Sequence, residues 1–257
     1  MSDRSLARVR LTVAYDGSGF RGFAANPGVR TVTEVLTDAI TTVTRHPVEV
    51  TGAGRTDAGV HAWGQVVSVD VPDDADLAEL QRRLNKLCGP EIAVRDAAWV
   101  AADFDARFSA AWRHYRYDIW NDPAPNPLLA GRAWHVARPL VRWALDAACD
   151  PLIGEHDFTS FCRRPKVDAG KDEPSLVRRV HLARWTTVDD GPHVRFEIRA
   201  NAFCHQMVRS IVGTLVDIGL GKVTPGDLRG ILLARDREAA GQVAPPHGLV
   251  LWEVAYP

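Results

Sequence analysis

The most informative stretch of this chain reads Thr51-Gly52-Ala53-Gly54-Arg55-Thr56-Asp57-Ala58-Gly59-Val60-His61-Ala62. It is small, polar and rich in glycine, and an alternating apolar segment follows it at 65–71. Glycine allows close approach to the backbone at a cost in chain entropy, so its concentration around Arg55 and Asp57 is compatible with a loop that a ligand approaches closely. The same residues would also form a tight turn capped by Asp57, with Arg55 in solvent. Composition alone does not choose between the two.

Length and composition are those of an ordinary globular protein, with 257 residues of which 46% are hydrophobic and 25% charged. Such a chain can bury a real core, as one large domain or two small ones. No apolar run approaches the ~18 residues of a membrane span, and the N-terminus leads straight into a strand-like pattern. We therefore expect a cytoplasmic protein without a membrane segment. The net charge of −1 counts mildly against a nucleic-acid partner, although a local basic surface is compatible with it.

The four cysteines are scattered along the chain and form no C-x-x-C pair. This pattern predicts neither a zinc site nor a disulfide framework, and reduced thiols are the expectation. The cysteines are Cys88, Cys149, Cys162 and Cys204.

Hydrophobic periodicity predicts a mixture of helices and strands. In the first half the expected strands are 9–15, 48–50, 65–71 and 92–100, and the expected helices are 35–43 and 76–87. Thr31 has capping-box spacing to Glu34, and Asp76 with Glu79 opens the second helix. In the second half the expected strands are 114–120, 180–188, 193–200 and 249–254, and the expected helices are 140–149, 207–220 and one opened by Pro225. Without strict βαβ regularity, this order predicts an α+β fold with a large, mainly antiparallel sheet.

Asp57 is the first candidate for chemistry, because an ionised aspartate in a loop can act as a nucleophile or a general base. Arg55 could pair with it, stabilise its charged form and contact a phosphate. His61 could be a second acid–base group, although a histidine packed where the next strand begins is the favoured interpretation.

Aromatic and basic residues alternate in Arg113-His114-Tyr115-Arg116-Tyr117. This arrangement is typical of a platform on which bases stack, but two tyrosines on one strand face can also belong to the core. We favour the core for Tyr117. Arg209 lies on an otherwise apolar helix, which suggests pairing with a carboxylate that could be Asp57.

Residues 163–184 contain seven Lys and Arg against three acidic residues. A solvated loop is the default interpretation of such a run, and contact with an RNA backbone is the functional one. The candidates for that contact are Arg163, Arg164, Lys166, Arg178 and Arg179.

Six separated blocks of the chain, in the same order, resemble the tRNA pseudouridine synthase A family. They are Tyr15-Asp16-Gly17 with the 51–62 loop, Ala106 to Ala110 with Tyr115-Arg116-Tyr117, Gly154 to Phe161, Asn201 to Arg209, His247-Gly248-Leu249 and the terminal Tyr256-Pro257. The resemblance implies an isomerase that converts uridine to pseudouridine at positions 38–40 of the tRNA anticodon stem-loop. It implies no cofactor or metal, and a homodimer that binds one tRNA across both subunits.

The fold implied by this resemblance is the pseudouridine synthase fold, with two RRM-like halves that form one large sheet flanked by helices. We expect an N-terminal half with the catalytic loop at 1–105, a C-terminal half at 106–257, and the active cleft between them. Asp57 would be the catalytic aspartate, Arg55 would help to flip the base, and Tyr115 would stack on the uracil. Arg209 would position the aspartate, and Leu249 would contact the substrate. Whether the carboxylate traps C1′ or removes the C2′ proton stays open.

Two departures from the family pattern fall near the N-terminal loop. The chain has Gly22-Phe23-Ala24 where the family usually has Gly-Trp-Gln, and Val32-Thr33 where it has Val-Gln. These departures change side chains near the N-terminal loop, where we expect them to affect the range of substrates or the affinity for tRNA more than the activity. The alternatives are a non-catalytic RNA-binding protein of the same fold, a synthase acting on another RNA, and a hydrolase using Asp57 with His61. The hydrolase would need a second carboxylate or a metal set near the loop, and none is evident.

Overall fold

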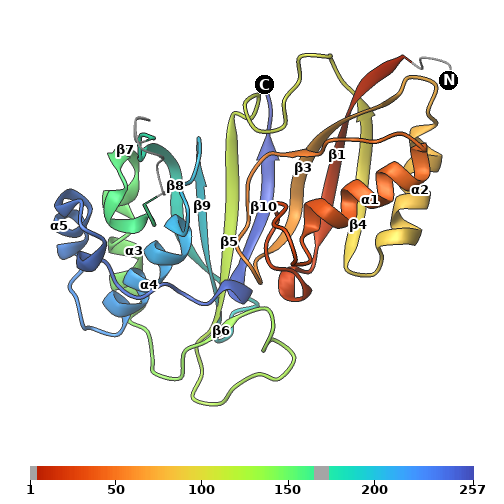
Figure 1. The fold of residues 1–257 in the computed structure, drawn as a ribbon. Coiled ribbons are helices and arrows are strands. Elements are labelled where there is room, and N and C mark those ends of the chain that lie inside the picture. The colour runs from red at the N-terminus through yellow and green to blue at the C-terminus, as the bar shows by residue number, and fades with distance from the viewer. Residues whose placement is uncertain (1–4, 165–173) are drawn as a thin grey trace. The chain divides into compact units, whose positions relative to one another are not determined.

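The structure is a computed structural model that describes residues 5–164 and 174–257. The chain divides into two compact units, and each is described by itself: unit 1 comprises Met1–Ala111 with Val250–Pro257, and unit 2 comprises Trp112–Leu249. The boundary predicted from the sequence lies after residue 105, which is six residues before the boundary after Ala111 in the structure. The last eight residues, expected in the C-terminal half, belong to unit 1. The mixture of helices and strands confirms the α+β class (Figure 1).

Unit 1 is built on strands in the order β4-β1-β3-β10, with β2 beside β3. Their bounds are β1 (Leu6–Tyr15), β2 (Thr51–Gly52), β3 (His61–Pro72), β4 (Ile92–Trp99) and β10 (Leu249–Ala255). β1 is antiparallel to both β3 and β4, whereas β10 is parallel to β3 and places Val250 opposite His61. The first strand of the chain and the last are therefore both neighbours of β3.

Two helices, α1 (Val32–Thr44) and α2 (Leu77–Cys88), lie side by side on one face of these strands (Figure 1). Val9, Leu11 and Val13 on β1 have no exposed surface, as expected for a strand face that packs on helices. Both helices begin at capping residues that the sequence predicts. The Thr31 side chain accepts the Glu34 N–H, and the Asp76 carboxylate accepts the N–H groups of Ala78 and Glu79.

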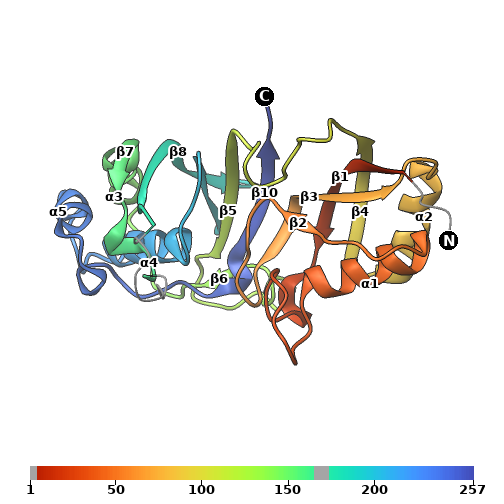
Figure 2. The same cartoon turned by 45° about the horizontal axis from the view of Figure 1, so that its top comes forward.

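Unit 2 has strands in the order β5-β9-β8-β7, all antiparallel, with β6 parallel to β5. They are β5 (Trp112–Trp120), β6 (Trp134–His135), β7 (Gly154–Asp157), β8 (Val177–Val188) and β9 (His193–Ala200). The helices are α3 (Arg142–Ala147), α4 (Met207–Gly219) and α5 (Asp227–Ala234), and Figure 2 shows α3 beside α4. The predicted hairpin of β8 and β9 is confirmed, and Asp189 and Asp190 adopt positive φ at its turn.

The strand predicted at 48–50 is wrong, since pairing with β3 begins only at Thr51. Apolar alternation shows which side chains face inward but not whether the backbone pairs with another strand. Residues 48 and 50 are half-buried, yet they do not pair with a neighbouring strand. Periodicity does not predict β6 and β7, because two and four residues are too short for a periodic signal. No helix in the described part of the chain is long and apolar enough to cross a membrane.

Candidate active site

Asp57 lies in the irregular segment between β2 and β3, which we call the signature loop (residues 53–60). Its side chain is half-buried, whereas the Arg55 side chain is exposed. The Val60 N–H donates to the Asp57 carbonyl at 3.1 Å, and Gly59 takes the positive φ of 77° that this turn requires. Asp57 thus sits on a closed turn directly before a buried strand.

A buried polar network holds the loop next to Asp57. The Tyr15 hydroxyl is 2.8 Å from the Thr56 Oγ1, and the Gln65 amide group donates to the Gly54 carbonyl at 2.7 Å. Gln65 also donates to the Tyr15 hydroxyl at 3.4 Å. The side chains of Tyr15, Thr56 and Gln65 are all less than a tenth exposed, and burial raises the pKa of Tyr15 to about 12. Tyr15 therefore stays a neutral phenol, able to donate and accept within this network.

The N-terminal loop supports the signature loop from a second direction. The Phe23 N–H donates to the Thr56 carbonyl at 3.0 Å, and its buried ring lies 6.3 Å from the ring of Tyr15. Gly22, at φ 106°, lets the backbone approach Thr56, because a Cβ there would lie 3.1 Å from that carbonyl oxygen. The departure at Phe23 therefore falls on a side chain that packs beneath the loop.

His61 is held where β3 begins. Its ring is 3% exposed, and its Nδ1 accepts the Gly17 N–H at 3.0 Å. The Asp16 carboxylate lies 3.1 Å from the same nitrogen. Such a ring orders the turn at Gly17, which agrees with the packed interpretation of His61.

Tyr115 and Tyr117 lie on β5 in unit 2. Tyr115 is 7% exposed and meets Phe203 edge-on, with ring centroids 5.0 Å apart. Tyr117 has no exposed surface and donates to the Pro245 carbonyl at 2.8 Å, which confirms its place in the core. Burial raises the pKa of Tyr117 as well. Both tyrosines are thus buried, and Tyr115 keeps slightly more exposed surface than Tyr117.

Arg209 lies in the first turn of α4 and is tied to the segment that leads to β10. Its Nε donates to the Ala244 carbonyl at 2.7 Å, and the Ala244 N–H donates back to the Arg209 carbonyl at 3.1 Å. Leu249, the first residue of β10, is buried. Just before it, Gly248 packs so closely on Tyr117 that an added Cβ would lie 2.7 Å from the ring.

A model of the tRNA pseudouridine synthase family matches residues 11–109 and 148–257. The tRNA pseudouridine synthase A of Bacillus subtilis is 40% identical over 252 residues, which cover 97% of this chain and 99% of that protein. The enzyme of the same name from Rhodospirillum rubrum is 44% identical over 253 residues, covering 98% of this chain and 88% of that protein.

The chain belongs to the tRNA pseudouridine synthase family. Arg55 and Asp57 fall in the first segment that matches the family, and Arg209 and Leu249 fall in the second. Tyr115 lies between the two segments. The family resemblance seen in the motifs is thereby confirmed over most of the chain.

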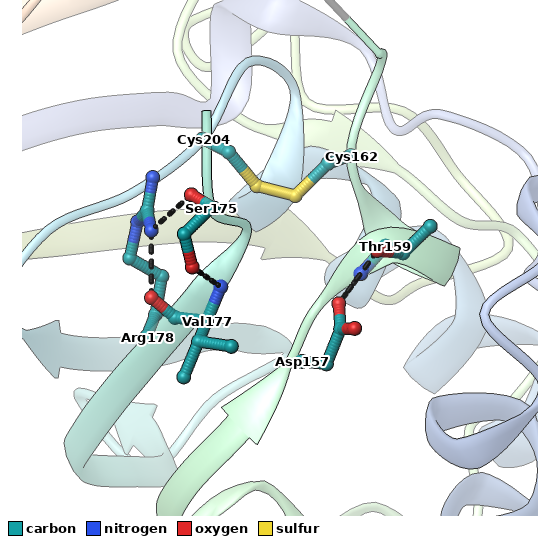
Figure 3. The surroundings of a disulfide bond; sticks show 7 residues. All are labelled: Asp157, Thr159, Cys162, Ser175, Val177, Arg178 and Cys204. Atoms are coloured by element: carbon teal, nitrogen blue, oxygen red, sulfur yellow. Dashed lines mark hydrogen bonds between the residues drawn. A yellow bond between two sulfur atoms is a disulfide. The ribbon is translucent and has the colours of Figure 1, made fainter. Parts of the chain in front are cut away.

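The basic residues proposed for RNA contact differ in their surroundings, and Lys166 lies outside the described residues. Arg178 donates to the carbonyls of Ser175 and Val177, and burial lowers the pKa of its guanidinium (Figure 3). Arg179 pairs with Glu155 on the neighbouring strand at 3.1 Å. Arg163 and Arg164 are exposed and follow the short helical turn at Thr159–Phe161.

One prediction about the cysteines is wrong: the structure joins Cys162 and Cys204 in a disulfide (Figure 3). The two lie 42 residues apart in the sequence, a spacing that belongs to no motif. Tertiary structure brings them together, because the segment after Cys162 runs beside the start of α4 and the Arg163 N–H donates to the His205 carbonyl. Cys88 and Cys149 are free and buried.

Sequence reasoning missed the network of Tyr15, Thr56 and Gln65 as a unit. Alternation assigns Tyr15 to a half-buried strand but does not pair it with a residue 41 positions away. The available signal was Gln65, a polar side chain at a position that alternation predicts to be buried. Within residues 5–164 and 174–257, no group of three or more His, Cys, Asp or Glu side chains could hold a metal ion.

Proposed function

We propose that this chain isomerises uridine to pseudouridine in tRNA, at positions 38–40 of the anticodon stem-loop, with Asp57 as the catalytic residue. Family membership over nearly the whole length supports the reaction. The observation that carries the assignment of Asp57 is its place in the signature loop, where a buried network fixes the adjacent Thr56. A reacting carboxylate needs such positioning, because a displacement of about one ångström can cost roughly a hundredfold in rate.

The reaction breaks the C1′–N1 bond, turns the uracil and joins C5 to C1′. The proton on C5 is lost and N1 gains one, so the product is an isomer of the substrate. The Asp57 carboxylate either forms a transient bond to C1′ or removes the C2′ proton, and both routes need it ionised. Arg55, exposed beside it, suits the extrusion of a base from the stem. The stacking of Tyr115 on the uracil is proposed from the family resemblance.

The remaining elements of this proposal come from the family resemblance. We propose a homodimer that acts in the cytoplasm, with Arg209 positioning Asp57 and Leu249 contacting the base. Sedimentation velocity of the purified chain, alone and with tRNA, tests the dimer. A single species with the mass of one chain at micromolar concentration would contradict it.

The decisive experiment is tritium release from an anticodon stem-loop labelled with [5-³H]uridine, with the wild type beside Asp57→Asn. We expect release by the wild type only, and equal RNA binding and thermal unfolding for the two proteins. No release by a wild type that binds the RNA tightly would favour the alternative of a non-catalytic RNA-binding protein. Release from other RNAs but not from tRNA would favour a synthase with another substrate.

A further inference from the structure

Unit 2 contains a cavity of about 500 Å³ that none of the proposed uridine contacts lines. Three segments of the chain form it: the residues after the Thr159–Phe161 turn, the residue before α4, and the segment that follows α5. The charged residues that line it are Arg163, Arg164, Arg235, Asp236, Arg237 and Glu238.

The lining of this cavity is strongly polar, with four arginines against two acidic residues and hence a net charge of +2. Arg163, Arg164 and Arg235 are exposed. Among the side chains that the structure describes, none forms a hydrogen bond or ion pair with the guanidinium group of Arg163 or Arg164. Arginines that face a cavity without neutralising partners favour an anionic ligand.

The backbone around the cavity is held by contacts that do not use the guanidinium groups of Arg163 and Arg164. The disulfide and the bond from the Arg163 N–H to the His205 carbonyl anchor the first segment (Figure 3). The Asp236 N–H donates to the Ser160 hydroxyl at 3.0 Å, which anchors the segment after α5. Arg237 donates to the carbonyls of Ala240 and Gly241, so its side chain braces this segment.

Arg235 has the most informative surroundings of the four arginines. It follows the last residue of α5 at φ 53°, a left-handed position that favours glycine. Its Nε lies 3.0 Å from the Asp157 carboxylate, so Arg235 is ion-paired, and its remaining guanidinium N–H groups are the ones available to a ligand. The backbone conformation at this position favours glycine, and the chain nevertheless has an arginine side chain there.

We propose that this cavity binds phosphates of the tRNA backbone, with Arg163, Arg164 and Arg235 as the contacting residues. The inference rests on the proposed function and extends it to a site separate from the residues assigned to the uridine. Planar guanidinium groups match the phosphate geometry, and several of them on one rim suit a phosphodiester chain. Contacts of this kind position a nucleic acid without reading its sequence.

The test compares Arg163→Gln/Arg164→Gln, Arg235→Gln and the wild type in binding to an unmodified tRNA transcript between about 50 and 200 mM salt. Arg229→Gln is the matched control, because Arg229 is an exposed arginine on α5 that does not line the cavity. We expect the slope of log affinity against log salt to fall by about one for Arg235→Gln and about two for the double variant. Affinity at low salt should fall on the order of tenfold for each arginine that is replaced. The control should match the wild type.

Salt slopes equal to that of the wild type in both test variants would overturn the inference, as would an equal change of slope in Arg229→Gln. Tritium release by the wild type, measured in parallel, keeps this outcome separate from a failure of the proposed function. If the wild type binds tRNA without releasing tritium and the slopes still fall, the phosphate site stands and the isomerase assignment does not.

Discussion

Tyr15 shows how a single side chain can determine the setting of the catalytic loop. Its hydroxyl is buried and bonded to Thr56 and Gln65, so its removal would leave two buried polar groups incompletely paired. Burial raises its pKa to about 12 against about 10 for a free tyrosine. The folded protein therefore favours the neutral phenol. This contribution to stability is complete below about pH 10 and is lost as the pH rises toward 12.

We predict that Tyr15→Phe lowers the free energy of unfolding by about 1–3 kcal/mol at neutral pH, because the partners lose a hydrogen bond. Above about pH 10 the difference in free energy of unfolding between the variant and the wild type should shrink. Raising a pKa from about 10 to about 12 corresponds to about 2.7 kcal/mol, and only the wild type loses this contribution. Urea unfolding on both sides of the pKa of free tyrosine, from about pH 8 to about pH 11, measures this. Equal pH dependence of the two proteins would contradict the role of Tyr15.

Among residues, the sequence identifies those whose chemistry shows in a motif, and it misses those whose partners come from elsewhere in the chain. Asp57 and Arg55 stand out because glycines surround them. The pairing of Cys162 with Cys204 does not, because neither residue belongs to a spacing pattern. The roles of Asp57, Arg55 and Tyr115 in the reaction stay predictions.

At the scale of elements, the short helical turn Gly17–Gly19 packs closely against the last residue of the signature loop. In the short helical turn Gly17–Gly19, a Cβ on Gly17 would overlap the Val60 carbonyl oxygen. A Cβ on Gly19 would instead meet the flexible end of Glu91, at 2.7 Å from a carboxylate oxygen. The two glycines therefore differ in what they contact, although they belong to one turn.

We predict that Gly17→Ala lowers the free energy of unfolding by about 1–3 kcal/mol and slows tritium release, since the backbone beside Asp57 must move. Gly19→Ala is the matched control and should change both quantities less, because the Glu91 carboxylate can shift. Urea unfolding measures the stability of the two variants, and initial rates of tritium release measure their activity. Equal effects of the two substitutions would show that the conformation of the turn, and not its contact with the signature loop, determines the stability and the rate of release.

The element boundaries themselves follow from local sequence wherever a cap or a long periodicity is present. Thr31 and Asp76 cap their helices as predicted, and β8 and β9 form the predicted hairpin. The strand at 48–50 and the unpredicted β6 and β7 show the limit of this reasoning. Short segments become strands through pairing with a neighbour, which periodicity does not report.

At the scale of the whole molecule, the last residues of the chain complete the unit that holds Asp57. β10 lies beside β3, where Trp252 stacks on Trp63 with ring centroids 5.9 Å apart. The Tyr256 hydroxyl donates to the Ala106 carbonyl at 2.7 Å. Local sequence could not show this, because a strand pattern at 249–254 names no partner.

We predict that a chain ending at Leu249 loses tritium release and that amide hydrogens at the start of β3 exchange faster, because His61 and Ala62 then lack their neighbouring strand. A chain lacking only the exposed Pro257 should behave as the wild type. Hydrogen exchange followed by mass spectrometry, with peptides from both units, locates the effect. Unchanged exchange in β3 of the shortened chain would show that β10 is dispensable for unit 1.

The parallel pairing of β10 with β3 also bears on how the protein is made. The ribosome synthesises the signature loop and β3 early and β10 last, so the nascent chain carries the loop before the strand beside it exists. During that interval the start of β3 at His61 and Ala62, which β10 later pairs, is open to pairing with other chains. A premature stop codon near the 3′ end of the message would leave every proposed catalytic group intact and still yield an incomplete sheet. Isomerase activity in a cell would therefore require that translation had passed through the codons of β10.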